Sequence, residues 1–279
     1  MNNMHKKIYY INGKFESSLN AQIRFGDSAF LYGDGLFETI RFQNKKLFSI
    51  NKHIERLRNG LSTMELKYDK TNQEIIELLE KTIQLNSIND GLLRLMITRG
   101  TIEGPIWEYE GKPNTYISIS QLIQKPNNPV KIIFVNEKDY PIIRFNPAIK
   151  SMNYIGNMKA KKDAMKQGAF EPVFYNHNNI VTECAIRNIF FIKSNELFTP
   201  SLDLGVLPGV MRDTILEIAK KQKLKIHETH ISMNEINNFD EAFISSSGIG
   251  ILECYWLNWQ SNYIMTKKLK KILAEKLTN

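Results

Sequence analysis

Lys150 is the residue of this sequence whose surroundings best suit covalent chemistry. It follows Pro147-Ala148-Ile149 and precedes Ser151-Met152, an apolar and small-residue setting in which an ammonium group is poorly solvated. Loss of hydration favours the neutral amine, which can act as a nucleophile or form an imine with a carbonyl group. The lysines at 159–166 lie among polar positions of a predicted helix. Taken alone, an ordinary surface lysine is the simpler interpretation of Lys150.

A long composite motif lies downstream of Lys150. It reads Glu183-Cys184-Ala185-Ile186-Arg187-Asn188-Ile189-Phe190, then Leu197-Phe198-Thr199-Pro200, and then Leu207-Pro208-Gly209-Val210-Met211-Arg212. This pattern resembles the signature of the class-IV pyridoxal-phosphate aminotransferases, with each of its elements at permitted spacing. Further stretches of resemblance lie at residues 33–41, 53–57 and 149–153, so that the resemblance covers nearly the whole chain.

The resemblance implies pyridoxal 5'-phosphate as the cofactor, held as a Schiff base by Lys150. A carboxylate at the ring nitrogen keeps that nitrogen protonated and the ring electron-withdrawing, and Glu183 is the matching residue. The resemblance also implies that Tyr154 hydrogen-bonds the phenolic oxygen of the cofactor. Without the resemblance, the alternative interpretation of Glu183 is a surface acid in a turn, and that of Tyr154 is an aromatic residue that packs against a helix.

The same resemblance implies a set of residues for the cofactor phosphate. Val210 and Met211 occupy a helix start, where free backbone amides and the helix dipole attract anions. Arg56 matches the phosphate arginine of the family, and Ser247 with Gly248 matches its hydroxyl and amide donors. A solvent-facing or ion-paired arginine and a polar turn are the alternative interpretations.

Substrates of such enzymes carry a carboxylate, which an arginine binds well. Arg41 and Arg94 lie on predicted strands and Arg99 directly follows one, and these three arginines are the candidates, together with Phe37 on the strand of Arg41. An Arg-x-His element that D-amino-acid aminotransferases carry after Arg-Gly-Thr is absent, because Arg99-Gly100-Thr101 continues as Ile102-Glu103-Gly104-Pro105-Ile106-Trp107. The arginine that typical aminodeoxychorismate lyases place in this loop is absent as well.

Three functions remain open at this point. The first is an aminotransferase that acts on an amino acid and a 2-oxo acid. The second is a lyase of the aminodeoxychorismate type, which would use the same Lys150 but eliminate pyruvate. The third, of another class, is a non-catalytic binding protein that kept the fold.

The elements that must position these residues begin with an antiparallel sheet. Residues 8–11 before Asn12-Gly13 predict a strand and a tight turn, and residues 37–42, 92–98 and 115–121 predict further strands. Asn51 is predicted to cap one helix. Thr71 and Glu74 form a capping box that predicts a second.

A proline-rich stretch at 124–130 is the best linker in the sequence. We therefore expect an N-terminal α/β domain at 1–123 and a C-terminal, cofactor-binding domain at 131–279. Helices near 153–167 and 209–221 and strands near 131–135, 172–175, 189–192 and 242–246 are predicted in the second domain. The resemblance implies an α+β fold of type IV, with a smaller N-terminal domain, a larger pseudo-barrel domain and a homodimer.

The composition is that of a folded globular chain. Hydrophobic residues make up 42% of the 279 residues and charged residues 24%, with a formal net charge of +8. Basic charge is the only support for nucleic-acid binding, so we expect none. No signal peptide or membrane span is expected. Only two cysteines and no ligand cluster are present, which predicts a cytoplasmic protein without a metal site.

Overall fold

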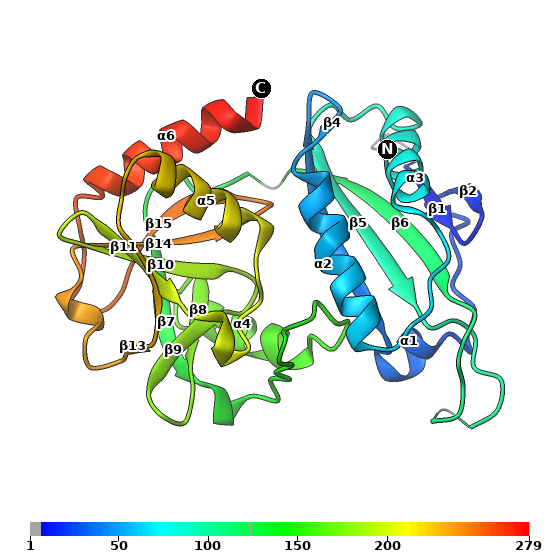
Figure 1. Ribbon diagram of the computed structural model, residues 1–279, viewed down its shortest axis with the longest axis horizontal. Helices are drawn as coiled ribbons and strands as arrows, with labels where there is room; N and C mark the ends of the chain where they lie inside the picture. The colour runs from blue at the N-terminus through cyan, green and yellow to red at the C-terminus, as the bar shows by residue number, and fades with distance from the viewer. Residues whose placement is uncertain (1–6, 106, 123, 279) are drawn as a thin grey trace. The chain divides into compact units, whose positions relative to one another are not determined.

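The computed structural model describes residues 7–105, 107–122 and 124–278. The chain forms two compact units (Figure 1). Residues up to 122 and the short segment 149–153 make the first unit, and residues 124–148 with 154–278 make the second. The segment that carries Lys150 therefore packs with the first unit, although it follows the predicted linker in sequence.

The first unit contains a six-stranded sheet in the order β2-β1-β6-β5-β3-β4. Every neighbouring pair in it is antiparallel. Its strands are β1 (Ile8–Ile11), β2 (Lys14–Ser17), β3 (Gly35–Gln43), β4 (Lys46–Leu47), β5 (Gly91–Thr98) and β6 (Asn114–Gln121).

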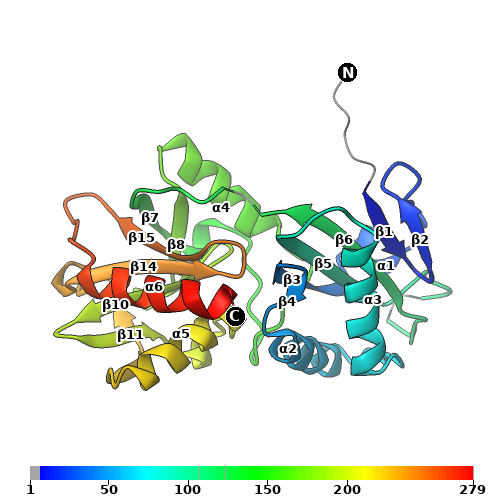
Figure 2. The same cartoon turned by 90° about the horizontal axis from the view of Figure 1, so that it is seen from above.

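Two long helices, α2 (Ile50–Thr63) and α3 (Asn72–Gln84), cover one face of this sheet (Figure 2). Alternate residues of β3 and β5 point into the core beneath them, among them Leu36, Ile40 and Leu93. The intervening residues Phe37 and Arg94 therefore lie on the other face. A short helix, α1 (Ser28–Tyr32), precedes β3 and is capped by Asp27.

The second unit contains a nine-stranded sheet in the order β12-β11-β10-β14-β15-β7-β8-β9-β13. The two edge strands, β12 and β13, are separated in sequence by His230 alone, so the sheet must curl until its edges meet. This is the pseudo-barrel that the resemblance implies. Its strands are β7 (Val130–Asn136), β8 (Glu171–Tyr175), β9 (Ile180–Cys184), β10 (Asn188–Lys193), β11 (Glu196–Pro200), β12 (Ile226–Thr229), β13 (Ile231–Ser232), β14 (Glu241–Ser246) and β15 (Gly250–Tyr255).

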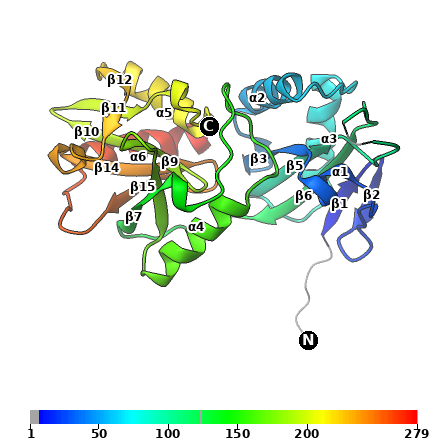
Figure 3. The ribbon, with the colours of Figure 1, turned by 90° about the horizontal axis from the view of Figure 1, so that it is seen from below.

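Three helices pack on the outside of this sheet. α4 (Ile155–Lys166) lies against β7 and β8, whereas α5 (Val210–Lys221) and α6 (Ile264–Thr278) lie over β14 and β15 (Figure 3). Apolar side chains such as Ile189, Phe191 and Leu252 fill one core cluster of the unit. Three short 3-10 helices complete it, η1 (Glu137–Asp139), η2 (Leu202–Leu204) and η3 (Ile236–Asn238).

The two predicted helix caps have different outcomes. The capping box is confirmed, because Thr71 N donates to Glu74 Oε2 at 2.6 Å and Glu74 N donates to Thr71 Oγ1 at 3.2 Å. The cap predicted at Asn51 is wrong. A left-handed residue, Ser49 with φ of 49°, turns the chain out of β4 and starts α2 at Ile50, so that Asn51 already lies inside the helix.

No helix in the described ranges is long and apolar enough to cross a membrane.

Candidate active site

Lys150 is held by backbone pairing at the beginning of β3. Phe37 N–H donates to the carbonyl of Lys150 at 3.0 Å, and Met152 N–H donates to the carbonyl of Gly35 at 3.0 Å. Ser151 bridges Leu36 between these two bonds. The lysine is half-buried, and its position is set by a sheet rather than by a loop.

The ring of Phe37 brings Lys150 and Arg94 together. Lys150 Nζ lies 4.4 Å from the ring centre and Arg94 Cζ lies 3.8 Å from it. Both distances suit a cation–π contact. Of the three candidate arginines, Arg94 is therefore the one that shares an aromatic neighbour with Lys150.

Arg41 occupies the same face of β3 as Phe37 but has a different environment. Its Nη2 donates to Gln43 Oε1 at 3.1 Å, and its Nε is buried without a hydrogen-bond partner among the described residues. Burial lowers the pKa of the Arg41 guanidinium, and the negative charge of Asp90 only partly offsets this effect.

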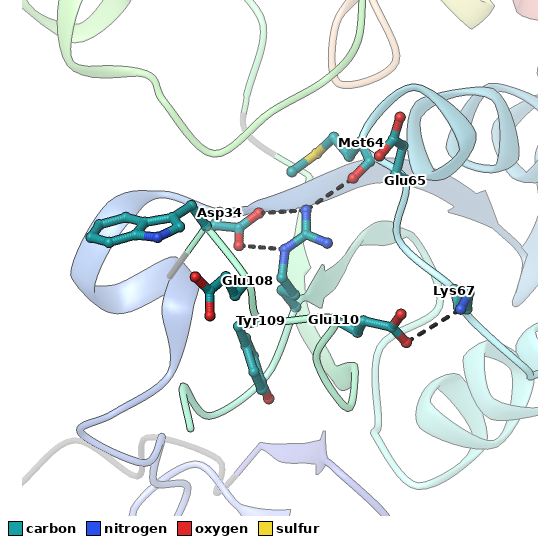
Figure 4. Close-up of a pocket in the computed structure, with 9 residues that line it drawn as sticks. Asp34, Met64, Glu65, Lys67, Glu108, Tyr109 and Glu110 are labelled. Carbon is teal, nitrogen blue, oxygen red and sulfur yellow. Dashed lines mark hydrogen bonds and ion pairs between the residues drawn. The ribbon is translucent and has the colours of Figure 1, made fainter. Parts of the chain in front are cut away.

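Arg99 is already engaged by other groups of the first unit. Its Nε and Nη2 donate to the Asp34 carboxylate at 2.7 and 3.3 Å, and Nη2 also donates to the carbonyl of Met64 at 2.9 Å. It lines a pocket of about 610 Å³. The acidic side chains Asp34, Glu65, Glu108 and Glu110 gather around this pocket (Figure 4), and their charge opposes the approach of a substrate carboxylate.

Arg56 belongs to a buried cluster between α2 and the sheet. Its Nε and Nη2 donate to the two oxygens of Glu38 at 2.8 and 2.6 Å. His53 Nδ1 lies 2.7 Å from Glu38 Oε2. Burial raises the pKa of Glu38, but the charge and hydrogen bonds of Arg56 and the hydrogen bond from His53 outweigh it and bring the pKa to about 2. Burial lowers the pKa of His53, although the hydrogen bond and the negative charge of Glu38 partly offset this effect.

Glu38 and His53 were not predicted as site residues. Two signals could have found them. Glu38 sits on β3 between Leu36 and Ile40, which face the core, and His53 lies one helical turn before Arg56 on the buried side of α2. A buried carboxylate needs such partners.

Glu183 lies in the second unit at the end of β9. One carboxylate oxygen accepts from Arg144 Nη1, and the other accepts from Leu207 N–H at 3.3 Å. Arg144 is also paired with Glu137. The cluster thus holds two carboxylates and one guanidinium, and its surplus negative charge fits a protonated ring nitrogen.

Val210 and Met211 are buried residues in the first turn of α5. Gly209 is the N-cap residue and has no side chain to occupy the first amides of the helix. A Cβ atom at Gly209 would lie 2.0 Å from Asn188 Oδ1, and Asn188 Nδ2 donates to the carbonyl of Leu207 at 3.0 Å. The asparagine therefore holds the loop that presents this helix start.

Ser247 and Gly248 lie in the turn between β14 and β15 and are half-buried. The preceding Ser245 is buried, and its Oγ has no partner among the described residues. Tyr154 is the N-cap residue of α4. The second unit thus offers a carboxylate, a helix start and a hydroxyl-bearing turn, which are the groups that the ring nitrogen and the phosphate of pyridoxal phosphate require.

Comparison with known proteins agrees with this chemistry. The model of the family described as amino-transferase class IV matches residues 35–254. The aminodeoxychorismate lyase of Bacillus subtilis is 32% identical over 253 residues, which cover 88% of this chain and 85% of that protein. A D-alanine aminotransferase of Listeria monocytogenes is 31% identical over 247 residues, which cover 86% and 84%.

The fold is shared with a solved enzyme as well. The structure of the branched-chain amino acid aminotransferase from Escherichia coli superimposes with a TM-score of 0.89 at 21% identity, and the match covers 98% of this chain and 95% of that one. The predicted two-domain α+β fold of type IV is confirmed. The chain belongs to the class-IV aminotransferase family and is an enzyme of this pyridoxal 5'-phosphate-dependent group.

Proposed function

We propose that this enzyme is an aminotransferase that moves an amino group between an amino acid and a 2-oxo acid. The observation that carries the proposal is the shared position of Lys150 and Arg94 at the ring of Phe37. Such an enzyme needs one amine for the cofactor and one cation for the substrate carboxylate. These two side chains supply both, and Arg94 is the carboxylate-binding arginine of the proposal in preference to Arg41 and Arg99.

When bound, pyridoxal phosphate supplies an electron sink that accepts the negative charge left at the substrate Cα. Lys150 Nζ would hold the cofactor covalently and, once released by the incoming amine, would move the Cα proton as general base and then general acid. Glu183 would accept a hydrogen bond from the ring nitrogen. Tyr154 would donate to the phenolic oxygen.

The phosphate would be held by donors from several elements. The backbone amides of Val210 and Met211 start α5, and Ser247 and Gly248 offer a hydroxyl and an amide in their turn. Arg56 would supply the positive charge, with its guanidinium oriented by the buried Glu38.

A lyase that releases pyruvate from aminodeoxychorismate is the second candidate. Its support is the 32% identity with the Bacillus subtilis lyase. The sequence of the loop after Arg99 weighs against it, since residues 102–107 contain no arginine. The aminotransferase is therefore the better-supported function.

Turnover assays separate the two candidates. The purified enzyme with pyridoxal phosphate is incubated with L- and D-amino acids, each with and without a 2-oxo acid acceptor, and separately with aminodeoxychorismate. We expect amino transfer that requires the acceptor. Pyruvate release from aminodeoxychorismate in the absence of any acceptor would overturn the aminotransferase in favour of the lyase.

We further propose that the enzyme is a homodimer. The segment around α1 exposes a group of large apolar side chains, with Phe25 79% and Phe30 64% exposed. Their rings contact each other at 5.8 Å, and exposed apolar groups of this kind mark interaction surfaces. Light scattering after size-exclusion chromatography should give twice the chain mass. Phe25→Ser with Phe30→Ser should shift it to the single mass, whereas Leu257→Ser in the second unit should not.

A cytosolic location is also part of the proposal. Cys184 and Cys254 are both free and buried, and burial raises the pKa of each thiol. Such cysteines suit a reducing compartment. Fractionation of cells that express the native gene would test it, with recovery in the membrane or secreted fraction as the contrary result.

A further inference from the structure

Arg144 lies in the second unit, in the segment between η1 and α4. Its Nε donates to Glu137 Oε1 at 3.1 Å, and its Nη2 donates to the same oxygen and to Thr182 Oγ1, the latter at 3.1 Å. Its Nη1 donates to Glu183 Oε1 and to the carbonyl of Gly205 at 3.5 Å. Every nitrogen of the guanidinium has a partner, and the side chain is only 22% exposed.

The partners of Arg144 make it a fixed positive charge. Thr182 Oγ1 donates to Glu137 Oε1 at 2.6 Å, which holds that carboxylate in place. Burial alone would lower the pKa of Arg144, but the adjacent charges of Glu183 and Glu137 more than compensate, and the pKa is raised. A planar guanidinium with several bonds cannot rotate without breaking most of them.

Glu183 retains capacity to bind a further donor. A carboxylate has about four acceptor positions, and here one oxygen accepts from Arg144 and the other accepts a long bond from Leu207 N–H. An ion pair that served only stability would need one carboxylate for one guanidinium. Two carboxylates around Arg144 leave one negative charge in excess, and Glu183 is the member at the end of β9.

We propose that Arg144 is a positioning residue that fixes the Glu183 carboxylate toward the ring nitrogen of the cofactor, with Glu137 and Thr182 holding Arg144 in turn. This inference deepens the proposed function and rests on its assignment of Glu183. Arg144 itself would touch neither cofactor nor substrate. Its effect passes through the orientation and charge balance of Glu183.

The affinity of the apoenzyme for pyridoxal phosphate tests the inference directly. Arg144→Gln should weaken binding by roughly tenfold or more, the loss typical when a group that orients a site residue is removed. Arg144→Lys keeps the charge with fewer donors and should give a smaller loss. Thermal unfolding of each apoprotein is measured in parallel, and Arg144→Lys serves as the informative variant should Arg144→Gln fold poorly.

A cofactor analogue with carbon in place of the ring nitrogen supplies the decisive comparison. Glu183 can accept no hydrogen bond from this ring position, so the wild type and the Arg144 variants should bind the analogue with affinities within about twofold of each other. A penalty of equal size for both cofactors would overturn the inference, because Arg144 would then act on the fold or on the phosphate.

Arg187→Gln is the matched control, since Arg187 pairs with the buried Glu171 in the same unit. It should lower the unfolding temperature but leave the affinity for both cofactors unchanged. An equal loss of cofactor affinity in Arg187→Gln would also overturn the inference. If pyridoxal phosphate binds but borohydride does not attach it permanently to Lys150, the proposed function is refuted. The affinity comparison would still decide the role of Arg144.

Discussion

The side-chain nitrogen of Lys150 lies against the ring of Phe37, with Nζ 4.4 Å from the ring centre. Phe37 is buried on β3, and its N–H donates to the carbonyl of Lys150. Phe37 thus holds Lys150 at two points: its N–H binds the lysine backbone, and its ring contacts the lysine Nζ. An amine anchored in this way can be displaced and can return to the same place, as repeated covalent chemistry requires.

Replacing Lys150 should remove the covalent link to the cofactor. Lys150→Ala should lower turnover by roughly a thousandfold or more, since the nucleophile and the proton carrier are lost together. The visible absorbance that borohydride abolishes should vanish as well. Lys166→Ala, at an exposed lysine paired with Asp163, is the control. Retention of turnover or of the reducible absorbance in Lys150→Ala would mean that another lysine holds the cofactor.

Replacing Arg94 should weaken substrate binding selectively. A hydrogen-bonded charge pair contributes about 1.5–3 kcal/mol, so Arg94→Gln should raise KM for the amino acid by roughly 10- to 100-fold. The affinity for pyridoxal phosphate should not change. Arg41→Gln and Arg99→Gln are the comparison variants. A larger increase in KM in either of them would reassign the carboxylate site.

The buried Glu38 should make stability depend on pH. Its pKa is about 2 in the folded chain, against an ordinary value of 4.5 for a glutamate carboxyl. Because the folded value is the lower one, the stabilisation is present in full above pH 4.5 and is lost as the pH falls from there toward 2. The loss should amount to about 3 kcal/mol. Urea unfolding of the apoprotein across this range would measure it.

Glu38→Gln should be less stable than wild type at pH 7, since it leaves Arg56 without its countercharge, and the cost of breaking such a buried pair is about 3–5 kcal/mol. Its stability should also vary less between pH 4.5 and 2 than that of the wild type. The exposed Glu110→Gln provides the control. Equal pH dependence in wild type and Glu38→Gln would contradict the role given to this carboxylate.

A side chain at Gly209 should destabilise the start of α5. In Gly209→Ala the new Cβ would meet Asn188 Oδ1 at 2.0 Å, and overpacking of this kind costs about 1–3 kcal/mol. We expect a lower unfolding temperature and weaker binding of pyridoxal phosphate, measured by titration. Adding Asn188→Ala would remove the clash. Weaker cofactor binding by the double variant than by Gly209→Ala would mean that loss of the Asn188–Leu207 hydrogen bond affects cofactor affinity more than relief of the clash does.

Local signals predicted local structure well. The capping box at Thr71 and Glu74 depends on residues three apart, and it fixed the beginning of α3 correctly. The start of α2 was misplaced because it depends on a left-handed turn at Ser49, a residue type that usually avoids that conformation. Nothing in the neighbouring sequence marks such a turn.

The site was predicted only as far as the family motif reaches. Glu183 was identified from that motif and Lys150 from the matching stretch at 149–153, and both remain proposals as site residues. The contacts that surround them join segments far apart in sequence, such as Phe37 with Lys150 and Arg144 with Glu183. Their residue types alone do not distinguish them from surface charges. Only tertiary structure shows which charges are buried together.

The two edge strands of the curled sheet meet at His230, and their shortness should limit aggregation of the second unit in concentrated solution. An open nine-stranded sheet would offer two long rows of unpaired amides and carbonyls to neighbouring molecules. Here the edges are β12, of four residues, and β13, of two residues. Neither is long enough to template a strand from another chain, so the curled sheet protects the unit against edge-to-edge aggregation.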